Sequence, residues 1–127
     1  REVTVYYGMN ELDGMSFNRN YRLNDGTIAS NPSKNLDSIK EPLAPIDRSV
    51  SSIRFVDKSG VNVGHIVNFA CHCDTAGGEG FEYCADYPGE MRRLLNEEYG
   101  EQSVTVFLCG CSGNINHIDF GQMIYLH

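Results

Sequence analysis

The clearest pattern of apolar and polar positions in the chain lies between residues 49 and 70. Residues 49–56 alternate between two faces and are rich in β-branched side chains, which is typical of a half-buried strand. Residues 57–60, Asp-Lys-Ser-Gly, have the composition of a turn. Residues 61–70 become continuously apolar towards their end, which indicates burial on both faces. The two runs therefore predict an antiparallel hairpin whose second strand lies deep in the protein.

A helix is predicted to begin at Asp86. Aspartate is a favourable N-cap residue, and Pro88 suits a first helical turn. Met91, Leu94 and Leu95 follow at the i, i+3, i+4 spacing that places side chains on one helical face. The pattern continues to about residue 99 and predicts a helix with one apolar stripe against the core.

The remaining pattern completes an α/β prediction. Gly100 suits the position after a helix, and residues 103–108 predict a further strand. Residues 3–7 predict a short strand, whereas residues 8–43 are rich in Asn, Asp, Ser and Gly and predict a long irregular N-terminal loop region. We therefore predict an α/β fold with a mixed β-sheet, an antiparallel hairpin and at least one covering helix, in which residues 1–127 form a single domain or part of a larger one.

Composition and charge narrow the classes of function. The 127 residues include 17 acidic and 10 basic side chains, for a formal net charge of −7. Nucleic-acid binding needs a basic face, so nucleic acid is not an expected partner, and simple charge attraction to an anionic membrane is not expected either. No apolar run approaches the length of a transmembrane helix.

Cellular location and oligomeric state stay open. The chain starts at Arg1 rather than at Met and ends at His127, which suggests a fragment of a longer protein. No signal peptide is visible, but a trimmed start would hide one. A secreted and a cytoplasmic protein are both consistent with the sequence.

The five cysteines include two C-x-C pairs, Cys71/Cys73 and Cys109/Cys111. In a strand each pair would point to one face, so four sulfurs could cluster if the two strand ends are neighbours. An odd number does not make a complete disulfide framework, and zinc sites usually separate paired cysteines by two to four residues. Reduced, half-buried thiols are therefore favoured over a four-cysteine zinc site.

His72 is the first candidate for chemistry, because it follows the apolar run 61–70 and precedes a loop of small residues. Glycines in such a loop let a substrate approach the backbone. The histidine is either a metal ligand or catalytic group, or a hydrogen-bonded structural residue. For Asp86, helix capping is a sufficient explanation. Arg19, in a polar segment, is either a solvated charge or a fork for a carboxylate or developing oxyanion.

A second loop, which follows the predicted strand 103–108, also carries candidates. Cys111 and Ser112 are possible nucleophiles, but the loop departs from the pattern G-x-S-x-G because Asn114 replaces the final glycine. It also lacks the G-K-[ST] ending of a P-loop. His117, close behind, could be a ligand, a base or a surface residue.

Six segments, taken in order, resemble the amino-terminal domain of the neutral/alkaline (non-lysosomal) ceramidase family. No single segment is specific, and the ordered series, from about Phe17 to about His117, carries the resemblance. The segments are Asn18-Arg19, Asn31-Pro32, Ile46-Asp47, Asn68-Phe69-Ala70-Cys71-His72, Ala85-Asp86-Tyr87-Pro88-Gly89 and Gly113-Asn114-Ile115-Asn116.

The resemblance implies a zinc-dependent amidohydrolase that cleaves the N-acyl bond of ceramide-like lipids, with this chain as part of its catalytic domain. It implies that His72 is a zinc ligand, that Arg19 positions the substrate around the reacting carbonyl, and that Asp86 supports the site. The family's remaining ligands, a histidine, a glutamate and a tyrosine, have no assigned counterpart in this chain.

Asn116 marks the main departure from the family. In the family the sequence of this loop resembles G-D-V-S-P-N, and its serine is the attacking or activating hydroxyl. Asn116 occupies the position of that serine. Asparagine cannot act as a nucleophile, but its amide could donate a hydrogen bond to an oxyanion. The preferred mechanism is therefore attack of a zinc-activated water on an amide or ester carbonyl, with Arg19 and Asn116 holding the oxygen that gains charge.

Three hypotheses follow from these residues. The first is a zinc hydrolase domain that acts on an amide or ester of a lipid-like substrate. The second is a non-catalytic remnant of that fold, which serves as a binding or scaffold domain; the substitution at Asn116 favours it. The third is a structural zinc module built on cysteines.

Overall fold

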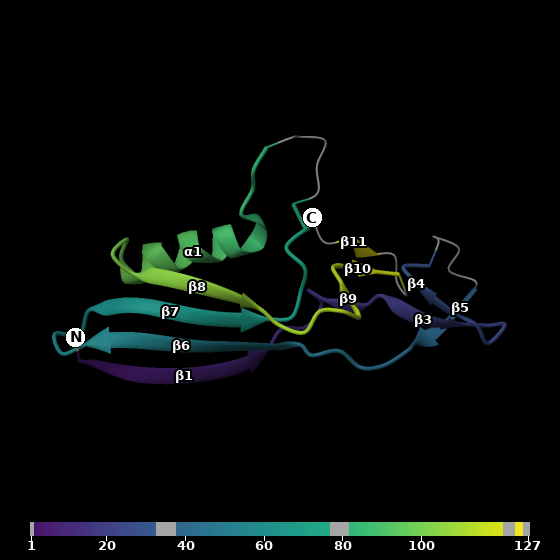
Figure 1. Ribbon diagram of the computed structural model, residues 1–127, viewed down its shortest axis with the longest axis horizontal. Helices are drawn as coiled ribbons and strands as arrows, with labels where there is room; N and C mark the ends of the chain where they lie inside the picture. The colour runs from purple at the N-terminus through teal and green to yellow at the C-terminus, as the bar shows by residue number, and fades with distance from the viewer. Residues whose placement is uncertain (1, 33–37, 77–81, 121–123, 126–127) are drawn as a thin grey trace.

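The computed structural model describes residues 2–32, 38–76, 82–120 and 124–125 (Figure 1). One helix and a set of strands make up the described part of the chain. In chain order they are β1 (Val3–Glu11), β2 (Phe17–Asn18), β3 (Asn20–Leu23), β4 (Ile28–Ser30), β5 (Ile39–Pro42), β6 (Ser49–Asp57), β7 (Asn62–Phe69), α1 (Asp86–Tyr99), β8 (Val104–Cys109), β9 (Ile115–Asn116), β10 (Ile118–Asp119) and β11 (Ile124–Tyr125).

The main sheet has the strand order β1-β6-β7-β8. β6 is antiparallel to both β1 and β7, while β8 runs parallel to β7. A parallel neighbour needs a crossover connection, and α1 supplies it. The helix lies over one face of the sheet at β7 and β8. The short strands form smaller sheets beyond the end of the main sheet at which β7 and β8 finish (Figure 1).

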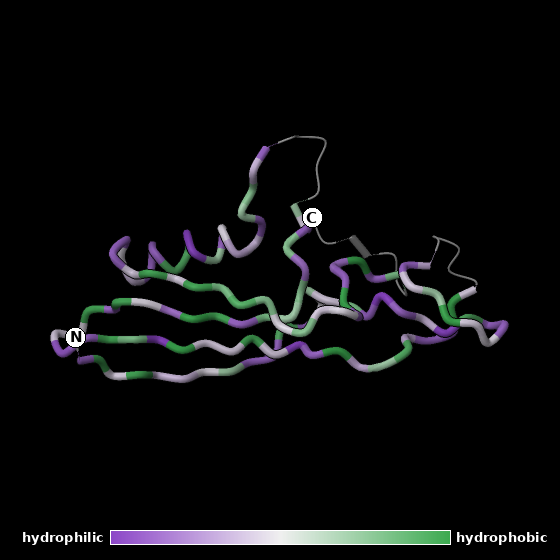
Figure 2. The backbone as a smooth tube through the Cα atoms, in the orientation of Figure 1, coloured by the Kyte–Doolittle hydropathy of each residue, from purple (hydrophilic) through white to green (hydrophobic). Residues whose placement is uncertain are grey.

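The two faces of the main sheet differ in cover. The pairing register puts Val67 beside Phe107 on the face that α1 covers. On the opposite face Ile66 pairs with Val106, and Val106 remains 46% exposed. Apolar residues therefore occupy both faces of β7 and β8, although α1 covers only one of them. Figure 2 shows apolar residues recurring along these strands.

The hydrophobic core lies at the end of β7. Phe69, Ala70 and Cys71 are buried there together with Ile115, which is fully inaccessible to solvent. Tyr87, in the first turn of α1, packs edge-on against Phe69 at 6.2 Å between ring centroids. Its hydroxyl donates to the Cys71 carbonyl at 2.8 Å, so the helix is fixed to the strand end by a ring and a hydrogen bond. The core therefore adjoins the loop that contains His72.

The main elements of the predicted fold are confirmed. The predicted hairpin is β6 and β7, with an Asp57–Gly60 turn in which Asp57 Oδ1 accepts from the amides of Ser59 and Val61. The predicted helix and the strand after it are α1 and β8, and Gly100 follows the helix with φ +95°. The α/β class fits broadly, but helix is the minor component and strands predominate.

Two predictions at the N-terminal side are wrong. The first strand extends to Glu11 rather than ending at residue 7. Residues 8–43, predicted as a loop, contain β2, β3, β4 and β5. These strands are two to four residues long, and β2 pairs with the distant β9, so no local alternation reveals them.

No helix in the described part of the chain is long and apolar enough to cross a membrane.

The Gly64→Ala substitution tests the parallel pairing of β7 and β8. A Cβ on Gly64 would lie 2.8 Å from the Val104 carbonyl oxygen, which is backbone and cannot turn away. We expect the free energy of unfolding in urea to fall by about 1–3 kcal/mol, as for other overpacked sites.

Gly8→Ala is the matched control, because its Cβ would meet only the Ser52 hydroxyl at 3.6 Å, an ordinary contact. This variant should be as stable as the parent protein or slightly more stable. Equal urea midpoints for the two variants would contradict the close approach of the β7 and β8 backbones.

Candidate functional site

His72 leaves the carboxyl end of β7 and lies beside the loop that follows β8. Its Nδ1 is 3.5 Å from the Ser112 hydroxyl. Its Nε2 is buried and has no hydrogen-bond partner among the described residues. A buried polar atom without a partner is costly, so this nitrogen is a candidate for a ligand.

The loop after β8 is held close to His72 by backbone contacts. Gly110 N–H donates to the Phe69 carbonyl at 3.0 Å, and a Cβ on Gly110 would lie 3.1 Å from the Ala70 Cβ. Ile115 N–H donates to the Ser112 carbonyl, which closes the loop into a turn. The strand ends thus keep Ser112 next to the histidine.

The five cysteines are free thiols. Burial, followed by the negative charge of Asp74, raises the pKa of Cys71 to about 11. Burial also raises the pKa of Cys73, and both thiols are therefore protonated and weakly nucleophilic near neutral pH. The described residues contain no group of three His, Cys, Asp or Glu side chains arranged to hold a metal ion.

Asp86 holds the loop after His72 rather than capping α1. The residue has φ +51°, and the helix has no side-chain cap. Oδ1 accepts from the Thr75 hydroxyl at 2.7 Å and from Tyr87 N–H at 2.8 Å, while Oδ2 accepts from Ala76 N–H at 2.7 Å. Partial burial alone would raise the pKa of Asp86, but these hydrogen bonds outweigh it and lower the pKa. The predicted capping role is therefore wrong, because the carboxylate is used across the loop.

Arg19 and Asn116 meet at Asn31. Arg19 N–H donates to the Asn114 carbonyl at 2.8 Å, and its own carbonyl accepts from Asn31 N–H at 2.7 Å. Asn116 Nδ2 donates to Asn31 Oδ1 at 2.9 Å, while Asn116 Oδ1 accepts from His117 N–H. The Nε of Arg19 is buried without a hydrogen-bond partner among the described residues. Asn31, which adopts φ +47°, thus links the backbone of Arg19 to the side chain of Asn116.

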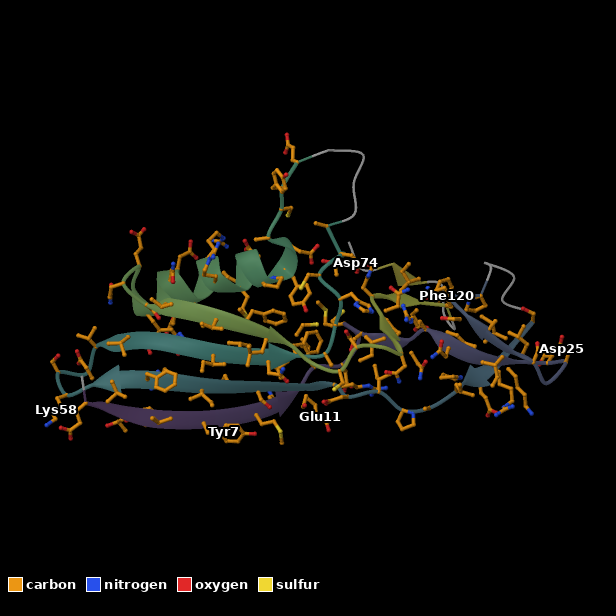
Figure 3. All side chains as sticks on the ribbon, in the orientation of Figure 1. Tyr7, Glu11, Asp25, Lys58, Asp74 and Phe120 are labelled. Atoms are coloured by element: carbon orange, nitrogen blue, oxygen red, sulfur yellow. The ribbon has the colours of Figure 1, made fainter. Side chains whose placement is uncertain are left out.

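His117 lies against the loop that follows His72. Its Nδ1 is 3.2 Å from Asp74 Oδ1, but without hydrogen-bond alignment, so this buried nitrogen has no hydrogen-bond partner among the described residues. Asp74, labelled in Figure 3, lies in the loop that leaves β7. The 110–117 loop therefore meets this loop twice, at Ser112 and at His117.

An apolar cavity of about 490 Å³ opens beside these groups, between α1 and the sheet. Its walls are mostly carbon, and Thr75 and His117 lie among them near the candidate site. The apolar residues that line it are Leu12, Met15, Val50, Val67, Phe69, Met91, Leu94 and Phe107.

Sequence reasoning identified some members of this constellation and missed others. His72, Arg19, Asn116 and Asp86 were predicted, and the structure places His72 beside the 110–117 loop, which carries Asn116. Asp74 was missed as a site residue, because its only local signal was its place two residues after the histidine. Asn31 had no chemical signal and was visible only in a segment of the ceramidase resemblance.

Comparisons with known proteins give the fold. No protein-family model matches the chain, and a search of curated proteins finds no match. The solved structures that match include "Ceramidase complexed with C2", at 22% identity and a TM-score of 0.63, over 91% of this chain and 17% of that one. Neutral ceramidase from Pseudomonas aeruginosa matches at 22% identity and a TM-score of 0.64, over 92% of this chain and 18% of that one. The chain has a ceramidase-like fold and spans less than a fifth of the length of these ceramidases.

The Asp86→Asn substitution tests whether the carboxylate fixes the loop after His72. Asparagine keeps one acceptor oxygen but presents an NH₂ group where Oδ2 accepts from Ala76. We expect amide hydrogen exchange at Ala76 to accelerate, and the free energy of unfolding to fall by about 1–3 kcal/mol.

Asp25→Asn is the control, because Asp25 Oδ1 alone accepts from both the amide and the hydroxyl of Thr27, and asparagine retains that oxygen. Its exchange pattern and stability should match those of the parent protein. Unchanged exchange at Ala76 in Asp86→Asn would mean that the carboxylate does not hold the loop.

Proposed function

We propose that this chain is part of a zinc-dependent hydrolase of the ceramidase-like family, which cleaves an amide (N-acyl) or ester bond of a lipid-like substrate. The observation that carries the proposal is the buried Nε2 of His72, which has no hydrogen-bond partner among the described residues, in a ceramidase-like fold. This atom needs a partner, and a metal ion is the partner that a strand-end histidine in such a fold would take.

The chemistry of His72 fits one zinc ligand. With Nδ1 near the Ser112 hydroxyl, the ring can be oriented by that contact while Nε2 stays available for the metal. A structural or catalytic zinc needs three or four protein ligands, and because the described residues contain no group of three, at least one ligand would come from outside them. When bound, zinc would supply the Lewis acidity that makes water a stronger nucleophile near neutral pH.

The oxygen that gains charge in the reaction would be held by Arg19 and Asn116. The guanidinium carries fixed positive charge, and its Nε has no other hydrogen-bond partner among the described residues. Asn116 uses one N–H for Asn31 and keeps the other for a substrate oxygen. Its carbonyl oxygen already accepts from His117, which fixes the orientation of the amide. This arrangement needs no serine nucleophile.

The apolar cavity supports a lipid-like substrate. Its walls bury hydrocarbon at a gain of about 0.8 kcal/mol per CH₂ group. Thr75 and His117 at the wall connect it to the loops around His72, so an acyl or alkyl chain lodged there would leave its polar end beside those loops.

A non-catalytic binding or scaffold domain is the second candidate. Asn116 favours this candidate, because it stands where the ceramidase family has a serine. Both the nitrogen and the oxygen of its side-chain amide make hydrogen bonds within the protein. Such a domain would keep the apolar cavity and bind lipid without cleaving it.

Zinc content separates these candidates. We expect the full-length protein to hold stoichiometric zinc, and His72→Ala to lose most of it, as measured by elemental analysis after dialysis. Cys111→Ser is the control, because this exposed thiol belongs to the alternative, cysteine-based site. If Cys111→Ser loses zinc and His72→Ala retains it, the cysteines rather than His72 bind the metal. If the parent protein holds no zinc, the non-catalytic scaffold domain is the remaining candidate.

Hydrolysis of a short-chain N-acylsphingosine tests the role of Arg19. Arg19→Met should lower kcat by about 10²–10³-fold, the usual effect of removing an oxyanion donor. Arg22→Met, which removes an arginine that faces Glu41 on the neighbouring strand, should leave kcat unchanged. Equal rates for both variants would exclude Arg19 from the reaction.

A further inference from the structure

A second pocket lies under the other end of α1, away from His72. It has a volume of about 270 Å³ and opens where β7 begins and the helix ends (Figure 1). Its lining combines aromatic rings with a single formally charged side chain, Arg54. The residues that matter below are Tyr6, Ser52, Arg54, His65, Leu95 and Tyr99.

Arg54 is held by rings rather than by a carboxylate. Its guanidinium carbon lies 5.0 Å from the centroid of the Tyr6 ring and 5.2 Å from that of the Tyr99 ring. None of the hydrogen bonds or ion pairs found in the described part of the chain uses its N–H groups, and none of these groups is a buried orphan. Cation–π contacts leave the edge of the guanidinium free to donate. The pocket therefore presents a planar, positively charged fork to solvent in a chain whose net charge is −7.

His65 gives the pocket a fixed polar floor. The residue is only 5% exposed, and its ring packs on Tyr99 at 4.9 Å between centroids. Asn62 Nδ2 donates to the Ser103 hydroxyl at 2.6 Å, and that hydroxyl lies within hydrogen-bond distance of His65 Nδ1, at 3.3 Å. Burial and then the charge of Arg54 lower the pKa of His65, which favours the neutral imidazole.

The geometry points to a binding site for a small aromatic carboxylate, with the carboxylate on the Arg54 fork and the ring against Leu95 and the parts of Tyr6 and Tyr99 that Arg54 leaves uncovered. A planar carboxylate matches the guanidinium edge in a two-point contact. An aromatic ring can meet the edges of the two tyrosines. The pocket volume suits a ligand of this size and is too small for a long chain. The site is separate from the proposed hydrolytic centre and does not depend on it.

Benzoate is the probe, titrated into the protein by calorimetry, with the ring resonances of Tyr99 followed by NMR. We expect saturable binding with one site, and Arg54→Met should weaken it by about tenfold or more, since a charge-assisted contact is lost. Benzyl alcohol, which lacks the carboxylate, and acetate, which lacks the ring, should each bind about tenfold more weakly than benzoate. Arg48→Met, which removes an arginine bound to Asp13, is the control and should bind benzoate like the parent protein.

Arg54→Lys is a second variant, in case Arg54→Met does not fold. It keeps the positive charge but lacks the planar guanidinium, so it should also weaken benzoate binding. Equal benzoate affinity in the parent protein and in either folded Arg54 variant would overturn the assignment. So would acetate or inorganic phosphate binding as tightly as benzoate, or the absence of benzoate binding up to about 10 mM. If neither variant folds, the comparison of benzoate with benzyl alcohol and acetate in the parent protein decides.

Discussion

The parallel pairing of β7 with β8 is the constraint on which the rest of the structure depends. Phe69 pairs with Cys109, so both strands end at the same edge of the sheet. The Gly110 amide donates to the Phe69 carbonyl, and a Cβ on Gly110 would make a tight contact of 3.1 Å with the Ala70 Cβ. Two loops from distant parts of the sequence therefore emerge side by side, one with His72 and one with Ser112. The same pairing requires a crossover, and the crossover helix brings Tyr87 over the strand ends.

Around that edge, hydrogen bonds within the protein fix several polar side chains in place. The Asp86 carboxylate accepts a hydrogen bond from the loop after His72. Asn116 is fixed by hydrogen bonds with Asn31 and His117. What remains is a small number of buried nitrogens without hydrogen-bond partners in the described residues, among them His72 Nε2 and Arg19 Nε. Each of these buried nitrogens is free to interact with a group from outside the described residues.

The face covered by α1 carries two cavities of opposite character. At the end of β7 the lining is almost entirely apolar and adjoins the candidate centre. Near the start of β7 the lining is divided between aromatic rings and the cationic Arg54, beside a neutral buried histidine. α1 thus covers both the apolar cavity and the pocket that contains Arg54, and Val67 lies in the wall of both.

The sequence by itself determined the hairpin, the helix and β8, because apolar periodicity over six or more residues is a local signal that burial enforces. It also singled out His72 by its place after a predicted strand, Arg19 by its polar segment and the ceramidase resemblance, and Asn116 by that resemblance. Only the tertiary structure decided that Asp86 supports a loop instead of a helix, that Asp74 meets His117, and that Asn31 joins Arg19 to Asn116. These contacts link residues far apart in the chain, and the strands β2 to β5 are too short to show a pattern. The position of β2 follows from its pairing with the distant β9, which no local preference encodes.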